Sequence, residues 1–270
     1  MARRKTKERT AAESDPHDLY ELSVQDPGRD CDFVEQAWKE VRGRAPRALR
    51  EDFCGSAITA IEWVKRSPRH TAIGVDLDPA VLGVASRRIT KRLKPEQRGR
   101  LRLLEESVLR VETDPVDCVL AMNFSYWLFK DRRTMKRYFR RVRDALVDDG
   151  LMILDAYGGS DTFLEMKEPR EIDGFTYVWD RQHYNPVSGD LIQHIHFRFP
   201  DGSKLTSAFV YEWRLWTLPE LIELLREAGF DDVTCYWEGS DEDGDGNGEW
   251  APTKVGEACA GWVAYLVAAK

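Results

Sequence analysis

The stretch of sequence that decides the fold is Glu51-Asp52-Phe53-Cys54-Gly55-Ser56-Ala57, which is followed by Thr71-Ala72-Ile73-Gly74-Val75-Asp76. The first segment reads as the end of a strand, a tight glycine turn and the start of a helix, and the second as the next strand. Such a turn lets backbone N–H groups approach an anionic group. An acidic side chain about 20 residues later can accept hydrogen bonds from both hydroxyls of a ribose. Gly55 and Asp76 therefore predict a nucleotide site, although singly they could be only a turn and a helix cap.

Short apolar segments alternate with amphipathic helices on both sides of this stretch, which indicates a parallel sheet with helical crossovers. Strands are predicted at residues 48–51, 71–76, 101–104, 117–122, 151–154, 233–237 and 262–267. Helices are predicted at about residues 30–41, from 56, from 78, at 131–146 and at 217–229. The last of these opens with a capping box at Thr217 and Glu220 and ends at Gly229.

The pattern changes at about residues 171–214. Three β-rich stretches run from Phe175 to Trp213, separated by turn signals at residues 185–189 and 200–202. They predict an antiparallel β insertion rather than a further strand–helix unit.

Composition restricts the class of protein. Of the 270 residues, 42% are hydrophobic and 32% are charged, as in ordinary globular proteins. No apolar run approaches the roughly 18 residues that span a bilayer, and no apolar segment of a secretory signal follows the basic residues 1–7. The cysteines are odd in number, widely spaced and without a CxxC pair, which indicates a reducing cytoplasm. A net charge of -7 does not favour a general role on nucleic acid.

Residues 51–57 resemble the first motif of the class I S-adenosylmethionine (SAM)-dependent methyltransferases, an acidic residue followed by G-x-G-x-G. Glu51 matches the acidic position and Gly55 the central glycine. Phe53 and Ala57 replace the outer two glycines. The dinucleotide-binding motif G-x-G-x-x-G is absent from this stretch.

Further segments resemble the same family. Residues 74–78 are similar to its second motif, which implies that Asp76 binds the ribose. Residues 106–108 stand where the family often has G-D-h beside the adenine, with Ser107 in place of the acid. The resemblance implies SAM as the cofactor. The cofactor-binding residues that it implies are Glu51, Phe53, Cys54, Gly55, Ala57, Asp76, Leu77, Ser107, Val108 and Asn123.

The resemblance runs from about residue 46 to the C-terminus and implies the fold. We expect an α/β, Rossmann-like seven-stranded sheet with helices on both faces, an antiparallel C-terminal strand pair and the antiparallel β insertion. Residues 1–45 are expected to form an N-terminal tail and helical lid, and residues 46–270 the SAM-binding domain. The insertion resembles the caps of small-molecule and amino-sugar N-methyltransferases, which roof the acceptor pocket and often mediate pairing. The resemblance therefore also allows a homodimer.

Candidate acceptor-facing residues follow the fourth and fifth predicted strands, because ligands of open α/β sheets collect at the carboxyl ends of the strands. The sulfonium of SAM is an activated leaving group, so the enzyme mainly aligns the acceptor. Asn123, Tyr126 and Tyr157 are the candidate catalytic residues, because they could position the acceptor. The sequence does not identify a catalytic residue beyond these candidates. The predicted substrate-binding residues are Tyr126, Trp127, Tyr157, Tyr211 and Arg214. Trp127 has the alternative interpretation of packing under the next helix, together with Phe124.

Two motifs suggest nucleic acid as an alternative substrate. Residues 123–126 resemble the N-P-P-Y motif of amino-methyltransferases that act on bases, but both prolines are missing. The predicted helix over residues 130–143 carries eight Lys and Arg residues. A solvated outer face is the preferred explanation of these charges, because the apolar stripe already accounts for the helix.

Two other motifs suggest a metal ion. His194 and His196 share one face of a strand, but no third ligand has a diagnostic spacing. Residues 241–246 resemble the start of an EF-hand loop, but position twelve is Pro252 instead of glutamate. We therefore predict no metal site.

The sequence thus predicts a SAM-dependent methyltransferase that acts on nitrogen or oxygen of a small-molecule metabolite. One alternative is a methyltransferase for nucleic acid or protein that uses the basic helix. Another is a non-catalytic nucleotide-binding protein, because the glycine turn departs from the motif.

Overall fold

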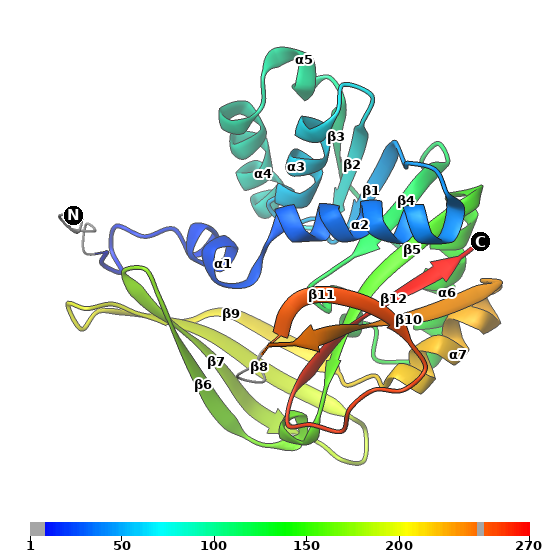
Figure 1. Ribbon diagram of the computed structural model, residues 1–270. Helices are drawn as coiled ribbons and strands as arrows, with labels where there is room; N and C mark the ends of the chain where they lie inside the picture. The colour runs from blue at the N-terminus through cyan, green and yellow to red at the C-terminus, as the bar shows by residue number, and fades with distance from the viewer. Residues whose placement is uncertain (1–8, 242–245) are drawn as a thin grey trace. The chain divides into compact units, whose positions relative to one another are not determined.

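The computed structural model describes residues 9–241 and 246–270, which form two compact units (Figure 1). The smaller unit contains the segment up to Gln25 together with Ser160–Leu215, and the larger unit contains Asp26–Gly159 and Trp216–Lys270. The predicted basic tail, residues 1–7, lies outside the described residues, as do residues 242–245 of the segment that resembles an EF-hand.

The larger unit is built on one eight-stranded sheet in the order β11-β10-β12-β5-β4-β1-β2-β3 (Figure 1). Its strands are β1 (Ala48–Asp52), β2 (Thr71–Asp76), β3 (Leu101–Glu105), β4 (Val116–Ala121), β5 (Leu146–Gly158), β10 (Asp232–Ser240), β11 (Gly246–Thr253) and β12 (Trp262–Ala269). Strands β3, β2, β1, β4 and β5 are parallel, and β12 pairs antiparallel with β5 and β10. All seven predicted strands are therefore present, and β11 adds an eighth beside β10.

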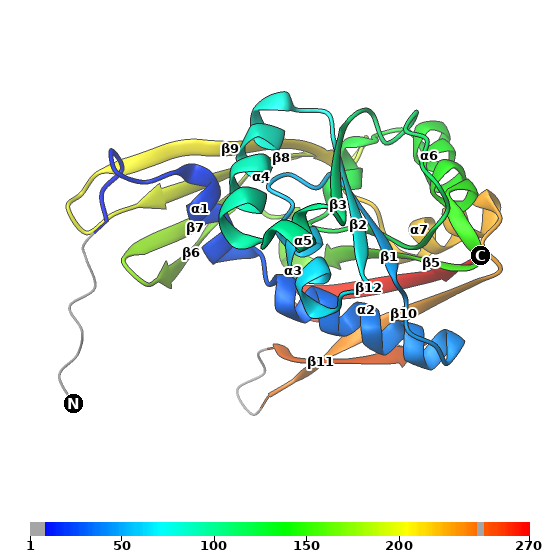
Figure 2. The same ribbon diagram turned by 90° about the horizontal axis from the view of Figure 1, so that it is seen from above.

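Helices cover both faces of this sheet. They are α2 (Pro27–Arg42), α3 (Ile58–Arg66), α4 (Pro79–Arg92), α5 (Pro95–Arg98), α6 (Arg132–Asp144) and α7 (Leu218–Ala228). Leu49 of β1 belongs to the core formed with α2, α3 and α4, whereas Asp52 of the same strand bonds Tyr138 of α6. Because successive side chains of a strand point to opposite faces, these helices lie on opposite sides of β1. Figure 2 shows α6 and α7 together, apart from α2, α3 and α4.

Local signals fix the ends of two helices. Asp78 caps α4 by accepting a hydrogen bond from Ala80 N at 2.8 Å. Thr217 and Glu220 form the predicted capping box of α7, and Gly229 ends that helix with a left-handed φ of 102°. Helix α4 thus begins where the sequence pattern predicts, and α7 both begins and ends there.

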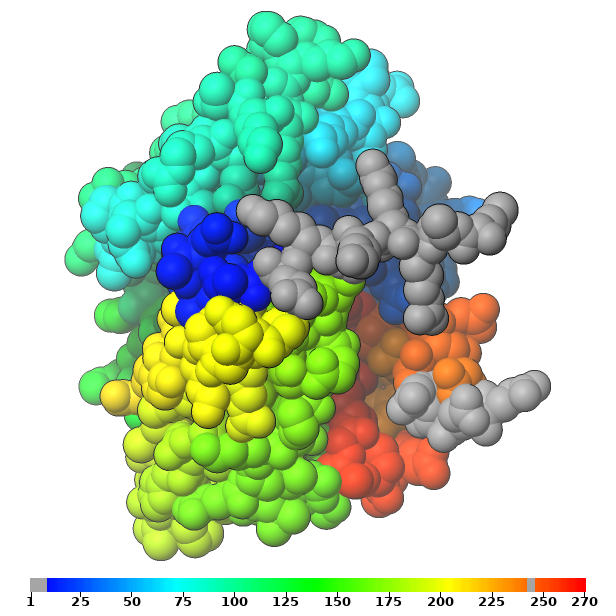
Figure 3. Space-filling model, turned by 90° about the vertical axis from the view of Figure 1, so that its left-hand side faces the viewer, coloured from blue at the N-terminus to red at the C-terminus, as the bar shows by residue number. Residues whose placement is uncertain are grey.

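In the described residues, the smaller unit contains a four-stranded antiparallel sheet, the α-helix α1 (Pro16–Val24) and a short 3-10 helix (Ser160–Phe163). Its strands, in spatial order, are β6 (Met166–Ile172), β7 (Phe175–Tyr184), β8 (Asp190–Arg198) and β9 (Lys204–Arg214). The last three are the predicted β-rich stretches, and Figure 3 shows these strands as a yellow-green to yellow surface. Strand β6 was not expected, because it is largely exposed and contains Pro169, as suits an edge strand.

A buried ion pair joins β1 to α6. Arg50 Nε and Nη2 donate to the two carboxylate oxygens of Asp52 at 2.8 and 3.0 Å, and Tyr138 Oη donates to Asp52 Oδ2 at 3.0 Å. Arg50 and Asp52 are only 0% and 1% exposed. An ion removed from water to this extent depends on its partner, because the protein interior offers it no other solvation.

We expect Arg50→Leu to lower the free energy of unfolding by about 3–5 kcal/mol, because it leaves the Asp52 carboxylate buried and unpaired. Urea unfolding followed by circular dichroism measures the loss. The double variant Arg50→Leu/Asp52→Leu is the control and should recover most of the stability, since neither charge remains. A single variant as stable as the parent chain would contradict this role of the pair.

Candidate functional site

The turn between β1 and α3 follows a backbone path that usually requires glycine. Phe53, Gly55 and Ala57 have φ angles of 56°, 53° and 57°, all in the left-handed region. These are the three glycine positions of the motif that the sequence resembles. A non-glycine residue held in this region costs on the order of 1–3 kcal/mol, so its surroundings must hold it there. The Phe53 ring packs 5.9 Å from that of Phe129 and 5.7 Å from that of Tyr138, between centroids.

Two carboxylates hold this turn. Glu51 Oε2 accepts a hydrogen bond from Ala60 N at 2.9 Å, which satisfies a backbone donor in the first turn of α3. Asp76 accepts from Gly55 N through Oδ2 at 2.8 Å and from Asp78 N through Oδ1 at 3.0 Å. Gly55 and Asp76, predicted to serve one site, are therefore in direct contact at the carboxyl ends of β1 and β2.

One side of the turn is open and the other is closely packed. A Cβ atom built on Gly55 would meet no atom within 4 Å, so a ligand can approach the backbone there. A Cβ atom on Gly74 would lie 2.9 Å from Cys54 Sγ, and Cys54 is buried. Cys54 can therefore offer a ligand only its backbone.

The ends of β2 and β3 extend the open edge. Glu106 N donates to Asp76 O at 3.0 Å, and Ser107 N donates to Glu106 Oε1 at 2.7 Å. Val108 is buried behind this turn, whereas Leu77 is 65% exposed. An apolar side chain this exposed, directly after Asp76, is available to cover a flat ring.

A third carboxylate holds a second left-handed turn at the end of β4. Asn123 and Phe124 have φ angles of 58° and 56°, and their backbone N–H groups donate to Asp155 Oδ2 and Oδ1 at 2.7 and 2.9 Å. Asp155 lies on β5 and is 6% exposed. Asp155 was not predicted to hold this turn, although its place directly after the apolar run 151–154 puts it near the carboxyl end of a strand.

The turn at Asn123 also tests the N-P-P-Y alternative. Phe124 occupies the position of the first proline and has a φ of 56°. Proline fixes φ near −65°, so a proline could not follow this backbone path. The resemblance of residues 123–126 to that motif therefore does not extend to its conformation.

The aromatic candidates near this turn form a packed cluster. Trp127 stacks on Tyr157 at 4.7 Å between centroids, and Phe124 meets Tyr157 edge-on at 4.6 Å. Tyr126 Oη donates to Asp155 O at 2.6 Å, and burial raises the pKa of Tyr126. The Tyr126 hydroxyl therefore links this turn to the backbone of β5. The fully buried Trp127 agrees with the packing interpretation.

Buried carboxyl groups give this edge its electrostatic character. Burial raises the pKa of Asp30 to about 7, that of Glu51 to about 8 and that of Asp155 to about 7. The charges of Asp30 and Asp76 raise the pKa of Glu51 further, and the charge of Asp30 acts on Asp155 in the same direction. A nearby cation would favour the ionised forms of all these groups. Asp30, at the start of α2, was not a sequence candidate.

The remaining predicted substrate-binding residues belong to the smaller unit. Tyr211 of β9 stacks on Trp213 with ring centroids 4.3 Å apart, and burial raises its pKa. Arg214 is the last residue of β9. Both thus lie on one strand, within the unit formed by the insertion and α1.

The histidines of the insertion bond polar neighbours. Asp180 Oδ2 lies 3.0 Å from His196 Nε2, and Ser207 N donates to His196 Nδ1 at 2.8 Å. His194 Nδ1 lies 3.0 Å from Ser207 Oγ. Within residues 9–241 and 246–270, no group of three or more His, Cys, Asp or Glu side chains is arranged to hold a metal ion.

Part of the basic face of α6 is used inside the larger unit. Arg132 and Lys136 both pair with Glu227 of α7, and Arg143 Nε donates to Gly229 O at 2.6 Å. These cations stabilise the packing of α6 against α7, as expected of an outer helix face. In the part of the chain that the structure describes, no helix is long and apolar enough to cross a membrane.

No family model and no curated protein matches the chain. Solved structures match it over nearly its whole length. A SAM-dependent methyltransferase from Clostridium acetobutylicum superposes with a TM-score of 0.68 at 18% identity, over 93% of this chain and 96% of that one. A sugar N-methyltransferase from a Streptoalloteichus species gives a TM-score of 0.63 at 20% identity, over 100% and 98% of the two chains.

A third match is an amino-pentose methyltransferase from Micromonospora echinaspora with SAM bound. It superposes with a TM-score of 0.65 at 16% identity, over 94% of this chain and 95% of that one. These superpositions establish the fold, and at identities this low they establish the fold alone. The chain therefore has the fold of the SAM-dependent methyltransferases.

Proposed function

We propose that the protein is a SAM-dependent methyltransferase that acts on nitrogen or oxygen of a small molecule. The observation that carries this proposal is the contact between Asp76 and Gly55 across the open edge of the turn. It places one carboxylate beside an accessible backbone, which is the arrangement that a nucleoside with a charged tail requires.

Each part of the cofactor has a candidate partner. Each carboxylate oxygen of Asp76 accepts one backbone hydrogen bond and keeps acceptor capacity for a ribose hydroxyl. Leu77 and the Ser107–Val108 turn are suited to the adenine. The open side of the turn at Gly55, supported by Glu51, Phe53, Cys54 and Ala57, is suited to the methionine part.

The charge of the cofactor suits the buried carboxyl groups. SAM carries a sulfonium and an ammonium cation against one carboxylate. Asp30, Glu51 and Asp155 are costly to ionise in the ligand-free protein, as their raised pKa values show. A bound cation would offset this cost, so the binding energy of SAM depends in part on these groups.

Positioning is the main chemical task of such a site. SAM supplies an electrophilic methyl group, and the protein must hold the acceptor in line with the methyl–sulfur bond. Asp155 fixes the turn at Asn123 and Phe124 through two backbone hydrogen bonds, so the Asn123 side chain starts from a rigid backbone. We propose Asn123 and Tyr157 as acceptor-positioning residues. Tyr211 and Arg214 stay candidates for acceptor binding on the grounds of the sequence.

The structural neighbours support a small acceptor. The similar chains include a sugar N-methyltransferase and an amino-pentose methyltransferase, and their matches span 100% and 94% of this chain. An amine of a small polar molecule is therefore the first acceptor class to test.

Replacing Asp76 tests the cofactor site. We expect Asp76→Ala to weaken SAM binding at least about tenfold in isothermal titration calorimetry, because two ribose hydrogen bonds and the support of Gly55 are lost. Asp78→Ala is the matched control, since it removes the same charge two residues away and only the cap of α4. Equal affinities in the parent chain and Asp76→Ala would refute the site.

The carboxyl groups predict a dependence on pH. Their pKa values of about 7 to 8 lie above those of an unfolded chain, about 4, so their neutral forms stabilise the fold at low pH. This stabilisation is lost progressively between the two pKa values, as the pH rises from about 4 to about 8. We therefore expect the melting temperature of the ligand-free protein to fall over that range.

SAM affinity should change in the opposite direction and rise severalfold between about pH 6 and about pH 7.5, below the range in which an α-amino group loses its proton. S-adenosylhomocysteine, which lacks the sulfonium charge, is the matched ligand and should respond less. Calorimetric titrations of both ligands at each pH measure the difference. Parallel pH profiles for the two ligands would contradict the electrostatic role of Asp30, Glu51 and Asp155.

The acceptor class is tested with SAM that carries a labelled methyl group. We expect label to enter small molecules of a fractionated cell extract, with amines as the first products to be sought by mass spectrometry. Label in nucleic acid or protein would support the basic-helix alternative instead. Tight SAM binding without transfer to any fraction would favour a non-catalytic nucleotide-binding protein.

A further inference from the structure

A polar hollow lies at the opposite end of the parallel strands from the turn at Gly55. It has a volume of about 430 Å³ and is lined by Arg44, Ala45, Pro46, Arg47, Arg69, His70 and Asp117. These residues precede β1 and β2 or begin β4, so they mark the amino ends of these strands. A second hollow of about 280 Å³ adjoins it and shares Arg44, Ala45, Pro46 and His70.

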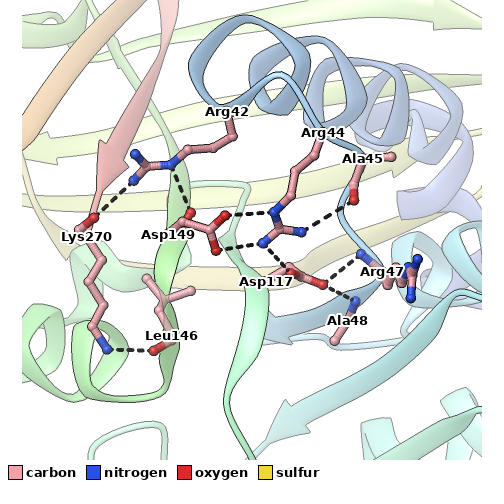
Figure 4. A network of polar contacts seen from close by, with 9 residues as sticks. All are labelled: Arg42, Arg44, Ala45, Arg47, Ala48, Asp117, Leu146, Asp149 and Lys270. Atoms are coloured by element: carbon pink, nitrogen blue, oxygen red, sulfur yellow. Dashed lines mark hydrogen bonds and ion pairs between the residues drawn. The ribbon is translucent and has the colours of Figure 1, made fainter.

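One wall of the hollow is a rigid polar network (Figure 4). Arg44 Nε and Nη2 each donate to a carboxylate oxygen of Asp149 at 2.7 Å, and Nη2 also donates to Asp117 Oδ1 at 2.8 Å. Asp117 Oδ2 accepts from the backbone N–H groups of Arg47 and Ala48 at 2.8 Å. The Asp117 carboxylate is thus already paired with a guanidinium and two backbone donors.

Another part of the lining comes from Arg69 and His70, in the turn before β2. Arg100 holds this turn by donating to the carbonyl oxygens of Val64, Ser67 and His70. The His70 ring stacks on that of Trp63 at 4.0 Å between centroids, with an interplanar angle of 8°. Burial lowers the pKa of His70, so the ring is uncharged at neutral pH and shapes the wall without adding charge.

Two guanidinium groups are left for a ligand. Arg47 and Arg69 are exposed, and among the described residues neither guanidinium has a hydrogen bond or an ion pair. Figure 4 shows the Arg47 guanidinium turned away from Asp117. Arg44, Arg47 and Arg69 carry three positive charges against the two negative charges of Asp117 and Asp149, so the hollow and its network have a net charge of +1. This is a positive site on a chain whose net charge is -7.

We propose that this hollow binds the phosphate group of a small phosphate ester, with Arg47 and Arg69 as its ligands. Guanidinium groups bind phosphate oxygens through paired, charge-assisted hydrogen bonds, and arginine matches this geometry better than lysine. The volume of the hollow falls within the range of about 300–1,000 Å³ that is usual for small-molecule sites. The occupant would not compete with SAM, because the two sites lie at opposite ends of the strands.

Calorimetric titration of the full chain with inorganic phosphate and with pyrophosphate, at constant ionic strength, tests the proposal. We expect Arg47→Gln/Arg69→Gln to weaken the binding of both at least about tenfold. Arg133→Gln/Arg137→Gln is the matched control, since it removes two exposed charges of α6 and should bind phosphate like the parent chain. Parent-like binding by the first variant, or an equal loss in both variants, would overturn the proposal.

Two further measurements separate this inference from its rivals. SAM affinity should be the same in the parent chain and in Arg47→Gln/Arg69→Gln, so the result does not depend on the function proposed above. A short single-stranded RNA should bind no more tightly than pyrophosphate. Tighter RNA binding that the α6 control variant weakens would assign the charges to a nucleic-acid surface and overturn the small-molecule site.

Discussion

The shape of the sheet edge at the carboxyl ends of the strands depends on carboxylates that accept hydrogen bonds from left-handed turns. Asp76 ties Gly55 to the end of β2, and Asp155 of β5 ties down the backbone of Asn123 and Phe124. Each turn contains residues whose φ is unfavourable for an L side chain. Without these hydrogen bonds, nothing would offset the conformational cost of the left-handed residues. The edge where a cofactor would bind is therefore shaped by hydrogen bonds from neighbouring strands.

The carboxyl groups of Glu51 and Asp155 are costly to ionise, and a cationic ligand bound nearby would offset this cost. Burial raises the pKa of Glu51 and Asp155 because a carboxylate loses its hydration there. Backbone N–H groups return only part of that solvation. In the proposed function, the side chains that support the turns would therefore also favour a cationic cofactor.

The two ends of the parallel strands differ in their chemistry. The carboxyl ends gather Asp30, Glu51, Asp76 and Asp155. The amino ends present Arg47 and Arg69, whose guanidinium groups have no partner among the described residues, beside the paired Arg44. Parallel strands bring like ends to one edge, so residues far apart in sequence accumulate at each edge. A sheet with this polarity can serve a cation at one end and an anion at the other without competition between them.

The sequence by itself determined the order of the seven predicted strands and of helices α2, α3, α4, α6 and α7, as well as the pairing of Gly55 with Asp76, because apolar periodicity and turn residues are local properties. Helix ends such as Gly229 followed from the same local signals. Only the tertiary structure decided that Phe53 and Ala57 adopt glycine-like angles and that Asp155 holds the next turn. Edge strands β6 and β11 also escaped prediction, since their polar sequences carry little periodicity. These features depend on contacts between residues distant in the chain, which no local pattern encodes.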